Sequence, residues 1–293
     1  MSVTVGQAIL LGTVQGLTEF LPVSSTTHLA IAQRFLPGFS QPGLLFDVVL
    51  HLGTLAAVAV FLRKRIADTL RGLVSRDEGE RRAAFRLVGL LALAVVLTGL
   101  VTMPLKNLAV EGMGEFRRMG FALCGTALLL LVAQRVGTAR GDGGRTVAEI
   151  RPRDAALVGA CQSASAILHG LSRSGNTISM GLFTGMSRQA AAEFSFLLSI
   201  PTILAAAAVE NWHAYKHHAG PLSNPGEGPA YAVGLVVSAA VGYLAVGMLL
   251  RLVVSMRLWP FVAYCAVLGL LLIAFGPRLG AAPEAALAAI RVR

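Results

Sequence analysis

The chain has 293 residues, of which 55% are hydrophobic and 14% are charged, and its mean hydropathy is +0.69. Soluble domains carry about a quarter charged residues, so this composition excludes an ordinary soluble protein and predicts an all-α integral membrane protein. The formal net charge of +10 arises in loops between apolar segments and not on one exposed face, so we expect no nucleic acid partner.

The chain begins with an apolar stretch whose first basic residue is Arg34, so we expect no ordinary cleavable signal peptide. Within 5–36 a helical run ends near Phe20, Pro22 interrupts it, and hydroxyl residues at 24–26 are good caps for a new helix. Neither half is comfortably long enough to cross a bilayer. The pattern therefore predicts a re-entrant helical hairpin.

Six further segments are long and apolar enough to be membrane helices, because a span needs about 20 mainly apolar residues. We expect these spans at 44–62, 85–105, 117–134, 191–209, 229–250 and 258–277. The rest of the chain is too short for a separate soluble domain, so we expect a single membrane domain over 1–293.

Basic residues gather in two of the intervening loops, with eight Lys or Arg at 63–86 and five at 135–153. By the positive-inside rule both loops are expected in the cytoplasm. The loop at 210–228 holds one Lys and is expected outside, as are both chain termini. Three histidines of that loop are interpreted as solvated: His213, His217 and His218.

Two stretches of the chain match at one constant offset of 148 residues, which predicts an internal repeat. Ser24 matches Ser172, and Phe46 matches Phe194. Each half also reads as a broken polar segment followed by three spans. Because three is an odd number, the second half should be inverted in the membrane.

We therefore expect inverted repeats over roughly 1–135 and 150–280, with a second re-entrant hairpin at 155–185 that Gly170 interrupts. The two hairpins would enter from opposite faces. Inverted repeats with broken helices place polar sites near the membrane interior, so the hairpin tips should meet there.

The first tip carries an amide, a carboxylate, hydroxyls and a histidine. Gln15 and Glu19 are four residues apart and share a helix face, while Ser24 and Ser25 precede His28 by four and three residues. An ionisable residue inside a membrane usually has a functional reason, so these groups are candidates for catalysis. In the alternative, Gln15 and Glu19 only hydrogen bond between helices and the hydroxyls only cap.

The second tip places Arg173 between Ser172 and Ser174 at a helix start. A guanidinium, hydroxyls and free backbone N–H groups form a site suited to a multiply charged phosphate. In the alternative, Arg173 pairs with Glu19 and binds no ligand. Such a pair would also suit the resting state of a phosphate site.

Other candidate groups point to structural roles. The three cysteines stand singly in apolar stretches, which predicts neither a disulfide framework nor a zinc site. Three ionisable residues that flank spans are interpreted as interfacial or structural: Asp47, His51 and Glu193.

With these residues placed, the sequence resembles the undecaprenyl pyrophosphate phosphatase family, the bacitracin resistance proteins of bacteria. The likeness runs over essentially the whole length and includes FDVVLHLGTLAAV at 46–58, SRSGNT at 172–177 and AAEFSFLLSIPTIL at 191–204. It implies an enzyme of the bacterial plasma membrane that removes the terminal phosphate of the C55 isoprenyl pyrophosphate and so recycles the lipid carrier for cell wall synthesis. It also implies a divalent cation, Mg²⁺ or Ca²⁺, and an active site open to the periplasm. A homodimer is compatible with it.

The resemblance assigns roles to residues that match the family's motifs. The catalytic residues that it implies are Glu19, Ser25, His28 and Arg173. Glu19 and Gln15 fall on the (Glu/Gln)xxxGlu pair and are the implied metal ligands. The residues expected to bind the substrate phosphates are Gln15, Ser24, Thr26, Ser172, Ser174 and Thr177.

Four positions depart from the family pattern. Gln15 offers a metal only a neutral carbonyl, which leaves Glu19 as the sole carboxylate. Thr27 stands where a glycine is usual, His169 where a proline is expected, and Cys265 where an arginine is expected. These departures open the way to a divergent substrate or weaker metal binding.

We expect in-line attack at the terminal phosphorus by Ser25, with His28 or Glu19 relaying its proton. Ser24 or a metal-activated water are the alternative nucleophiles. The rival from another class is a transporter or flippase of an isoprenyl phosphate lipid, which would use the same anion site without chemistry.

Overall fold

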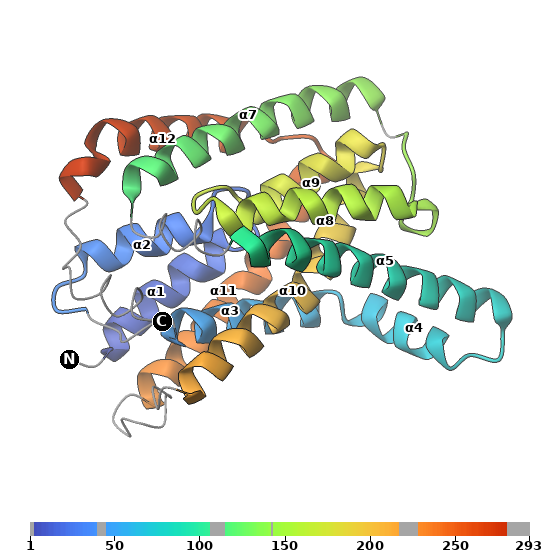
Figure 1. Ribbon diagram of the computed structural model, residues 1–293, viewed down its shortest axis with the longest axis horizontal. Helices are drawn as coiled ribbons and strands as arrows, with labels where there is room; N and C mark the ends of the chain where they lie inside the picture. The colour runs from blue at the N-terminus through green and yellow to red at the C-terminus, as the bar shows by residue number, and fades with distance from the viewer. Residues whose placement is uncertain (1–2, 40–44, 106–114, 142, 217–227, 280–293) are drawn as a thin grey trace.

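The computed structural model describes residues 3–39, 45–105, 115–141, 143–216 and 228–279. Within these ranges the chain is helical apart from its turns and one isolated bridge between Arg145 and Met186. The α-helices are α1 (Val5–Thr18), α2 (Ser25–Phe35), α3 (Leu45–Phe61), α4 (Arg63–Leu73), α5 (Glu78–Thr102), α7 (Phe116–Arg140), α8 (Pro152–Ile167), α9 (Arg173–Thr184), α10 (Arg188–Lys216), α11 (Gly228–Val254) and α12 (Trp259–Leu279). Figure 1 shows how these helices are arranged.

Five helices are long and apolar enough to cross a membrane: α5, α7, α10, α11 and α12. A sixth span results if α3 and α4, which are bent by 74° at their junction, count as one. The expected all-α integral membrane fold is therefore confirmed, and the chain is a multi-pass membrane protein. The bend was not expected, and it occurs where the apolar sequence of α3 gives way to Arg63, Lys64 and Arg65.

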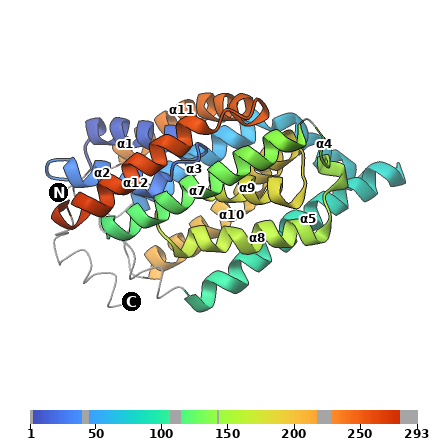
Figure 2. The same cartoon turned by 90° about the horizontal axis from the view of Figure 1, so that it is seen from above.

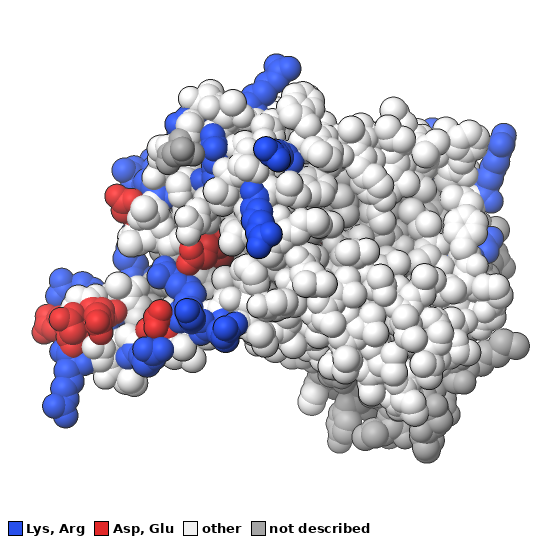
Figure 3. Space-filling view, turned by 180° about the vertical axis from the view of Figure 1, so that it is seen from behind, with Lys and Arg blue, Asp and Glu red and all other residues white. Residues whose placement is uncertain are grey.

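Charged side chains gather toward the end of the molecule formed by α4 and the start of α5, and a broad surface beside them is without charge (Figure 3). Arg86 of α5 donates hydrogen bonds to the carbonyls of Ala148 and Ile150 in the second basic loop. The two arginine-rich segments thus lie at the same end, as a shared membrane face requires. The histidines His213, His217 and His218 fall outside the residues whose side chains the structure describes.

The two short helix pairs, α1 with α2 and α8 with α9, each pack as a helical hairpin. Ser24 caps α2 by accepting from the Thr27 N–H, and Ser172 caps α9 by accepting from the Gly175 N–H. With the offset of 148 residues, α1 and α2 coincide with α8 and α9 to within one residue at each end. Entry of the hairpins from opposite membrane faces, and the inverted halves 1–135 and 150–280, stay predictions.

The long helices pack against one another and against the hairpins. α7 lies along α12, α1 along α11, and α8 along α5, and Figure 2 shows α7 and α12 side by side. The largest cluster of buried apolar side chains includes Phe20, next to the first tip, and Phe196 of α10, whose rings meet edge to face at 5.8 Å. The hairpin tips are thus held against the apolar centre of the molecule.

A close helix crossing at a glycine positions α3 against α11. A Cβ on Gly53 of α3 would clash with the Ser238 Oγ and with the Leu235 carbonyl of α11. Small residues let membrane helices approach this closely. The crossing therefore holds α3, and with it His51, at a fixed distance from α11.

We expect Gly53→Ala to destabilise the protein by about 1–3 kcal/mol, because the added methyl group overpacks the α3–α11 contact. The measurement is the unfolding midpoint in detergent. Gly99→Ala in α5 is the matched control, since a Cβ there meets nothing within 4 Å and alanine favours a helix. Equal midpoints for the two variants would contradict the packing argument.

Candidate active site

The two hairpin tips meet through an ion pair between Glu19, just after α1, and Arg173, the first residue of α9. An Arg173 Nη lies 2.5 Å from Glu19 Oε1, across 154 residues of sequence. The side chains are 5% and 18% exposed, so most of the pair is shielded from water. The pairing of Arg173 with Glu19, which the sequence offered as the alternative interpretation, is therefore present, and it joins the two tips.

The second carboxylate oxygen of Glu19, Oε2, is in contact with three further side chains. Ser25 Oγ donates to Oε2 at 2.7 Å, and Gln15 Nε2 donates to it at 3.0 Å. His51 Nε2 lies 3.4 Å from the same oxygen. The carboxylate is thus the centre of the site, with an arginine on one oxygen and a serine hydroxyl on the other.

Two polar atoms in this site are buried and lack a hydrogen-bond partner: Gln15 Oε1 and Arg173 Nη1. Buried polar groups are nearly always satisfied, so each unpaired one needs an explanation. One is an acceptor and the other a cationic donor, and they flank the same carboxylate. A bound ligand that brings a cation and phosphate oxygens would satisfy both.

The structure distinguishes the two candidate serines of the first tip. Ser24 is buried, and its Oγ caps α2 and contacts the hydroxyls of Thr26 and Thr27 at 3.1 Å. Its φ of 71° lies in the left-handed region that favours glycine, and such strain is typical of functional tips. Ser25 is partly exposed and its hydroxyl faces Glu19, so it is the serine with a base in contact.

The hydroxyls of the second tip are buried and engaged with protein atoms. Ser172 caps α9, Ser174 Oγ donates to the Leu21 carbonyl of the first tip, and Thr177 Oγ1 lies 2.6 Å from Ser195 Oγ. The Ser174 contact joins the two tips, and the Thr177 contact joins α9 to α10. Direct phosphate binding by Ser172, Ser174, Thr177 and the exposed Thr26 stays a prediction.

His28 lies at the first tip but does not reach Ser25 or Glu19 among the described contacts. Its Nδ1 is 2.7 Å from the Ser24 carbonyl, and its Nε2 is 2.6 Å from the Tyr264 hydroxyl. The backbone carbonyl accepts from Nδ1, which leaves Nε2 to face Tyr264. Of the two proton relays considered, the geometry favours Glu19, and catalysis by His28 stays a prediction.

Sequence reasoning missed His51, which was interpreted as interfacial or structural. Its Nδ1 donates to the Asp47 carbonyl at 2.7 Å, one helical turn earlier, and this bond turns Nε2 toward Glu19. No spacing rule links 19 to 51, because they lie on different helices. The one available signal was a histidine in an apolar helix, which is rare enough to merit a functional hypothesis.

For the pyrophosphate hydrolysis that the family resemblance implies, we expect His51→Leu to lower kcat/KM roughly fivefold to tenfold, because one partly exposed group next to Glu19 is lost. His51→Gln keeps a side-chain donor and should recover most of the rate. The readout is the separate kcat and KM of phosphate release. If Leu and Gln give the same loss, His51 acts only through packing.

The atoms present fit a divalent cation that the substrate helps to hold. Mg²⁺ and Ca²⁺ take oxygen ligands, and Mg²⁺ is often held by one or two carboxylates plus substrate phosphates. Glu19 supplies a carboxylate, and Gln15 supplies a buried unpaired carbonyl oxygen beside it. In the described part of the chain no group of three or more His, Cys, Asp or Glu could hold a metal ion.

Two of the residues that depart from the family pattern, Thr27 and Cys265, contact residues of the first tip. Thr27 Oγ1 contacts Ser24 Oγ, and the buried Cys265 of α12 donates its thiol proton to the Pro22 carbonyl at 3.3 Å. His169 Nδ1 is buried without a hydrogen-bond partner near the second tip. None of the three residues touches Glu19 or Arg173 among the described contacts.

Most of the chain matches known proteins in sequence. The family model described as "Bacitracin resistance protein BacA" matches residues 8–271. The "Undecaprenyl-diphosphatase" of Syntrophotalea carbinolica is 41% identical over 264 residues, which cover 89% of this chain and 95% of that protein. The protein of the same name from Trichlorobacter lovleyi is 38% identical, with 90% and 94% covered, and that of Myxococcus xanthus is 38% identical, with 91% and 87% covered.

Proposed function

The chain belongs to the bacitracin resistance protein BacA family, and on that premise we infer that it is an undecaprenyl-diphosphatase. It hydrolyses the C55 isoprenyl pyrophosphate to the monophosphate and inorganic phosphate, and so recycles the lipid carrier of cell wall synthesis. The single observation that carries this proposal is the contact of Glu19 with both Arg173 and Ser25 where the two hairpin tips meet.

We propose that Ser25 is the nucleophile and Glu19 its base. Ser25 Oγ attacks the terminal phosphorus while Glu19 Oε2, 2.7 Å away, accepts its proton. The bond between the terminal phosphorus and the bridging oxygen breaks, and the lipid monophosphate leaves with the electron pair. Water then attacks the phosphoserine, and the bond between phosphorus and Ser25 Oγ breaks. Ser25 Oγ takes back the proton that Glu19 holds, and inorganic phosphate departs with both protons of the water, which restores the Glu19 carboxylate.

Arg173 supplies charge where phosphoryl transfer needs it most. Its Nη1 is already free of protein partners, and its other Nη pairs with Glu19. Phosphoryl transfer relies on positioning and on neutralising the equatorial oxygens, which an arginine does well. The N-termini of α2 and α9 add the positive ends of their helix dipoles at the same place.

We also propose that a divalent cation, held by Glu19, Gln15 and the pyrophosphate itself, adds charge neutralisation when it is bound. The free Gln15 Oε1 supports this assignment. The active site is proposed to open to the periplasm, since the arginine-rich segments mark the opposite, cytoplasmic end.

Phosphate release separates this proposal from its rival, a transporter or flippase of an isoprenyl phosphate lipid. The purified protein should convert undecaprenyl pyrophosphate to undecaprenyl phosphate with one inorganic phosphate per lipid, in the presence of Mg²⁺ or Ca²⁺. A transporter would bind the lipid, move it across a liposome and release no phosphate. That result would exclude the enzyme.

A further inference from the structure

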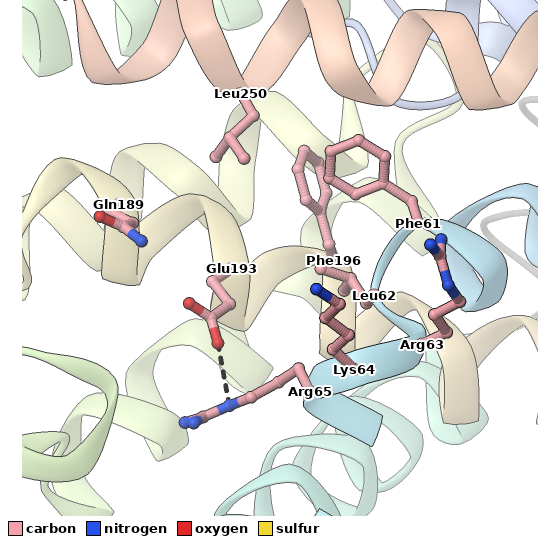
Figure 4. A pocket seen from close by; sticks show the side chains of 9 residues that line it. All are labelled: Phe61, Leu62, Arg63, Lys64, Arg65, Gln189, Glu193, Phe196 and Leu250. Carbon is pink, nitrogen blue, oxygen red and sulfur yellow. Dashed lines mark ion pairs between the residues drawn. The ribbon is translucent and has the colours of Figure 1, made fainter. Parts of the chain in front are cut away.

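A second site lies away from the hairpin tips, at the corner where α3 bends into α4. Here a cavity of about 350 Å³ opens between this corner, the start of α10 and the end of α11. Its volume falls in the range of small-ligand pockets. Figure 4 shows Arg63, Lys64 and Arg65 on one side of it and Phe61 beside Phe196 on another.

The cavity carries an excess of positive charge. Arg65 Nε pairs with Glu193 at 2.9 Å, which leaves Arg63 and Lys64 without an acidic partner among the described residues. Both of these side chains are exposed at the rim. Two uncompensated cations beside a paired arginine favour an anion with several oxygen acceptors, such as a phosphate group.

The other wall of the same cavity is apolar. Phe61, Phe196 and Leu250 line it, so an occupant must offer hydrocarbon as well as charge. A free phosphate ion would leave this wall in contact with water. A phosphate joined to acyl chains would cover it.

The place of the cavity in the fold fits a lipid headgroup. α3 is an apolar helix, and α4 leaves it at 74° with basic residues at its start and the exposed apolar Leu70 and Val74 further along. A basic amphipathic helix of this kind lies in the membrane interface. α10 begins just after Ser187, whose N–H donates to the Arg145 carbonyl in the second basic loop, so the cavity lies at the arginine-rich end.

We propose that this cavity binds the headgroup of an anionic phospholipid in the leaflet at the arginine-rich end of the protein. Arg63 and Lys64 contact the phosphate, and the first carbons of the acyl chains cover Phe61 and Phe196. Neither Glu19 nor Arg173 lines the cavity, so the site is separate from the one that hydrolyses the pyrophosphate.

Titration of the delipidated full chain in detergent, followed by native mass spectrometry, tests the proposal. Phosphatidylglycerol should bind at least tenfold more tightly than phosphatidylcholine with the same chains. Arg63→Ala/Lys64→Ala should lose this preference by roughly tenfold or more. The matched control is Arg81→Ala/Arg82→Ala on α5, which removes equal charge from the same end and should keep it. Equal loss in both pairs, or no preference in the native chain, overturns the proposal.

Two further measurements distinguish binding of a lipid from an effect of misfolding and from binding of a simple phosphate ion. Glu193→Gln frees Arg65 and should tighten phosphatidylglycerol binding, a change that misfolding cannot produce. Inorganic phosphate at tenfold excess over the lipid should leave the lipid bound, and displacement by it would show an ion site only and contradict the proposal. Phosphate release from the pyrophosphate lipid should persist in Arg63→Ala/Lys64→Ala, which separates this site from catalysis.

Discussion

Arg173→Ala is expected to lower phosphate release from undecaprenyl pyrophosphate by about 10³-fold or more. The guanidinium is the one arginine or lysine side chain in contact with Glu19 among the described residues. Removal of an arginine that stabilises transferring phosphate typically costs 10³ to 10⁵ in rate. Arg173→Lys keeps the charge without the planar fork and should recover part of the loss.

The same substitution leaves Glu19 buried without its main partner, which is destabilising in its own right. Glu19→Gln/Arg173→Ala removes the unpaired charge and should restore the unfolding midpoint without restoring activity. Arg140→Ala is the matched control, because Arg140 also binds α9, at its far end, through the Leu182 carbonyl at 2.5 Å. More than a tenth of wild-type activity in Arg173→Ala would show that the anion site lies elsewhere.

Glu19→Gln is expected to lower kcat by about 10²- to 10⁴-fold while the protein still binds the lipid. The amide keeps the size of the side chain but cannot accept the Ser25 proton. It also releases Arg173 from its ion pair, so lipid affinity should hold or rise. The measurement is phosphate release beside lipid binding for the same preparation.

Glu193→Gln is the matched control for that experiment. Glu193 is also a carboxylate in a membrane helix, and it also pairs with an arginine, Arg65, at 2.9 Å. Its amide variant should release phosphate at the wild-type rate. Equal losses in Glu19→Gln and Glu193→Gln would indicate a general effect on folding and remove the reason to assign the base to Glu19.

The sequence was sufficient to predict that the two tips meet and bring polar side chains together. The constant offset that matched Ser24 with Ser172 identified two helix starts, and both serines do cap helices. The i, i+4 spacing correctly placed Gln15 on the same face as Glu19, and their side chains are bonded. These successes rest on local rules, which hold within one helix or one cap.

The contacts across helices could not be predicted in the same way. His51 and Tyr264 reach the first tip from α3 and α12, and only packing decides that. The spacing of Ser24, Ser25 and His28 suggested a serine–histidine pair, but His28 uses its ring nitrogen on the Ser24 backbone carbonyl four residues back. A side chain in a helix lies over the preceding turn, where a carbonyl competes with the hydroxyl.

The bend between α3 and α4 shows a similar limit. The apolar run at 44–62 was expected to be a membrane span, and α3 occupies it. The direction of α4 depends on where the side chains of Arg63, Lys64 and Arg65 can lie in a polar environment. Hydropathy alone does not predict that direction. The cavity at this corner could therefore not be predicted from the sequence.

The central claim, that Ser25 attacks phosphorus with Glu19 as its base, is tested most directly by rapid-quench trapping of a phosphorylated protein. Undecaprenyl pyrophosphate labelled in its terminal phosphate is mixed with excess protein, quenched within milliseconds and digested. The account predicts label on Ser25 itself, located by fragmentation, and none in Ser25→Ala, which should also lose phosphate release. Wild-type release by Ser25→Ala, with no label on the protein at any quench time, would contradict the account.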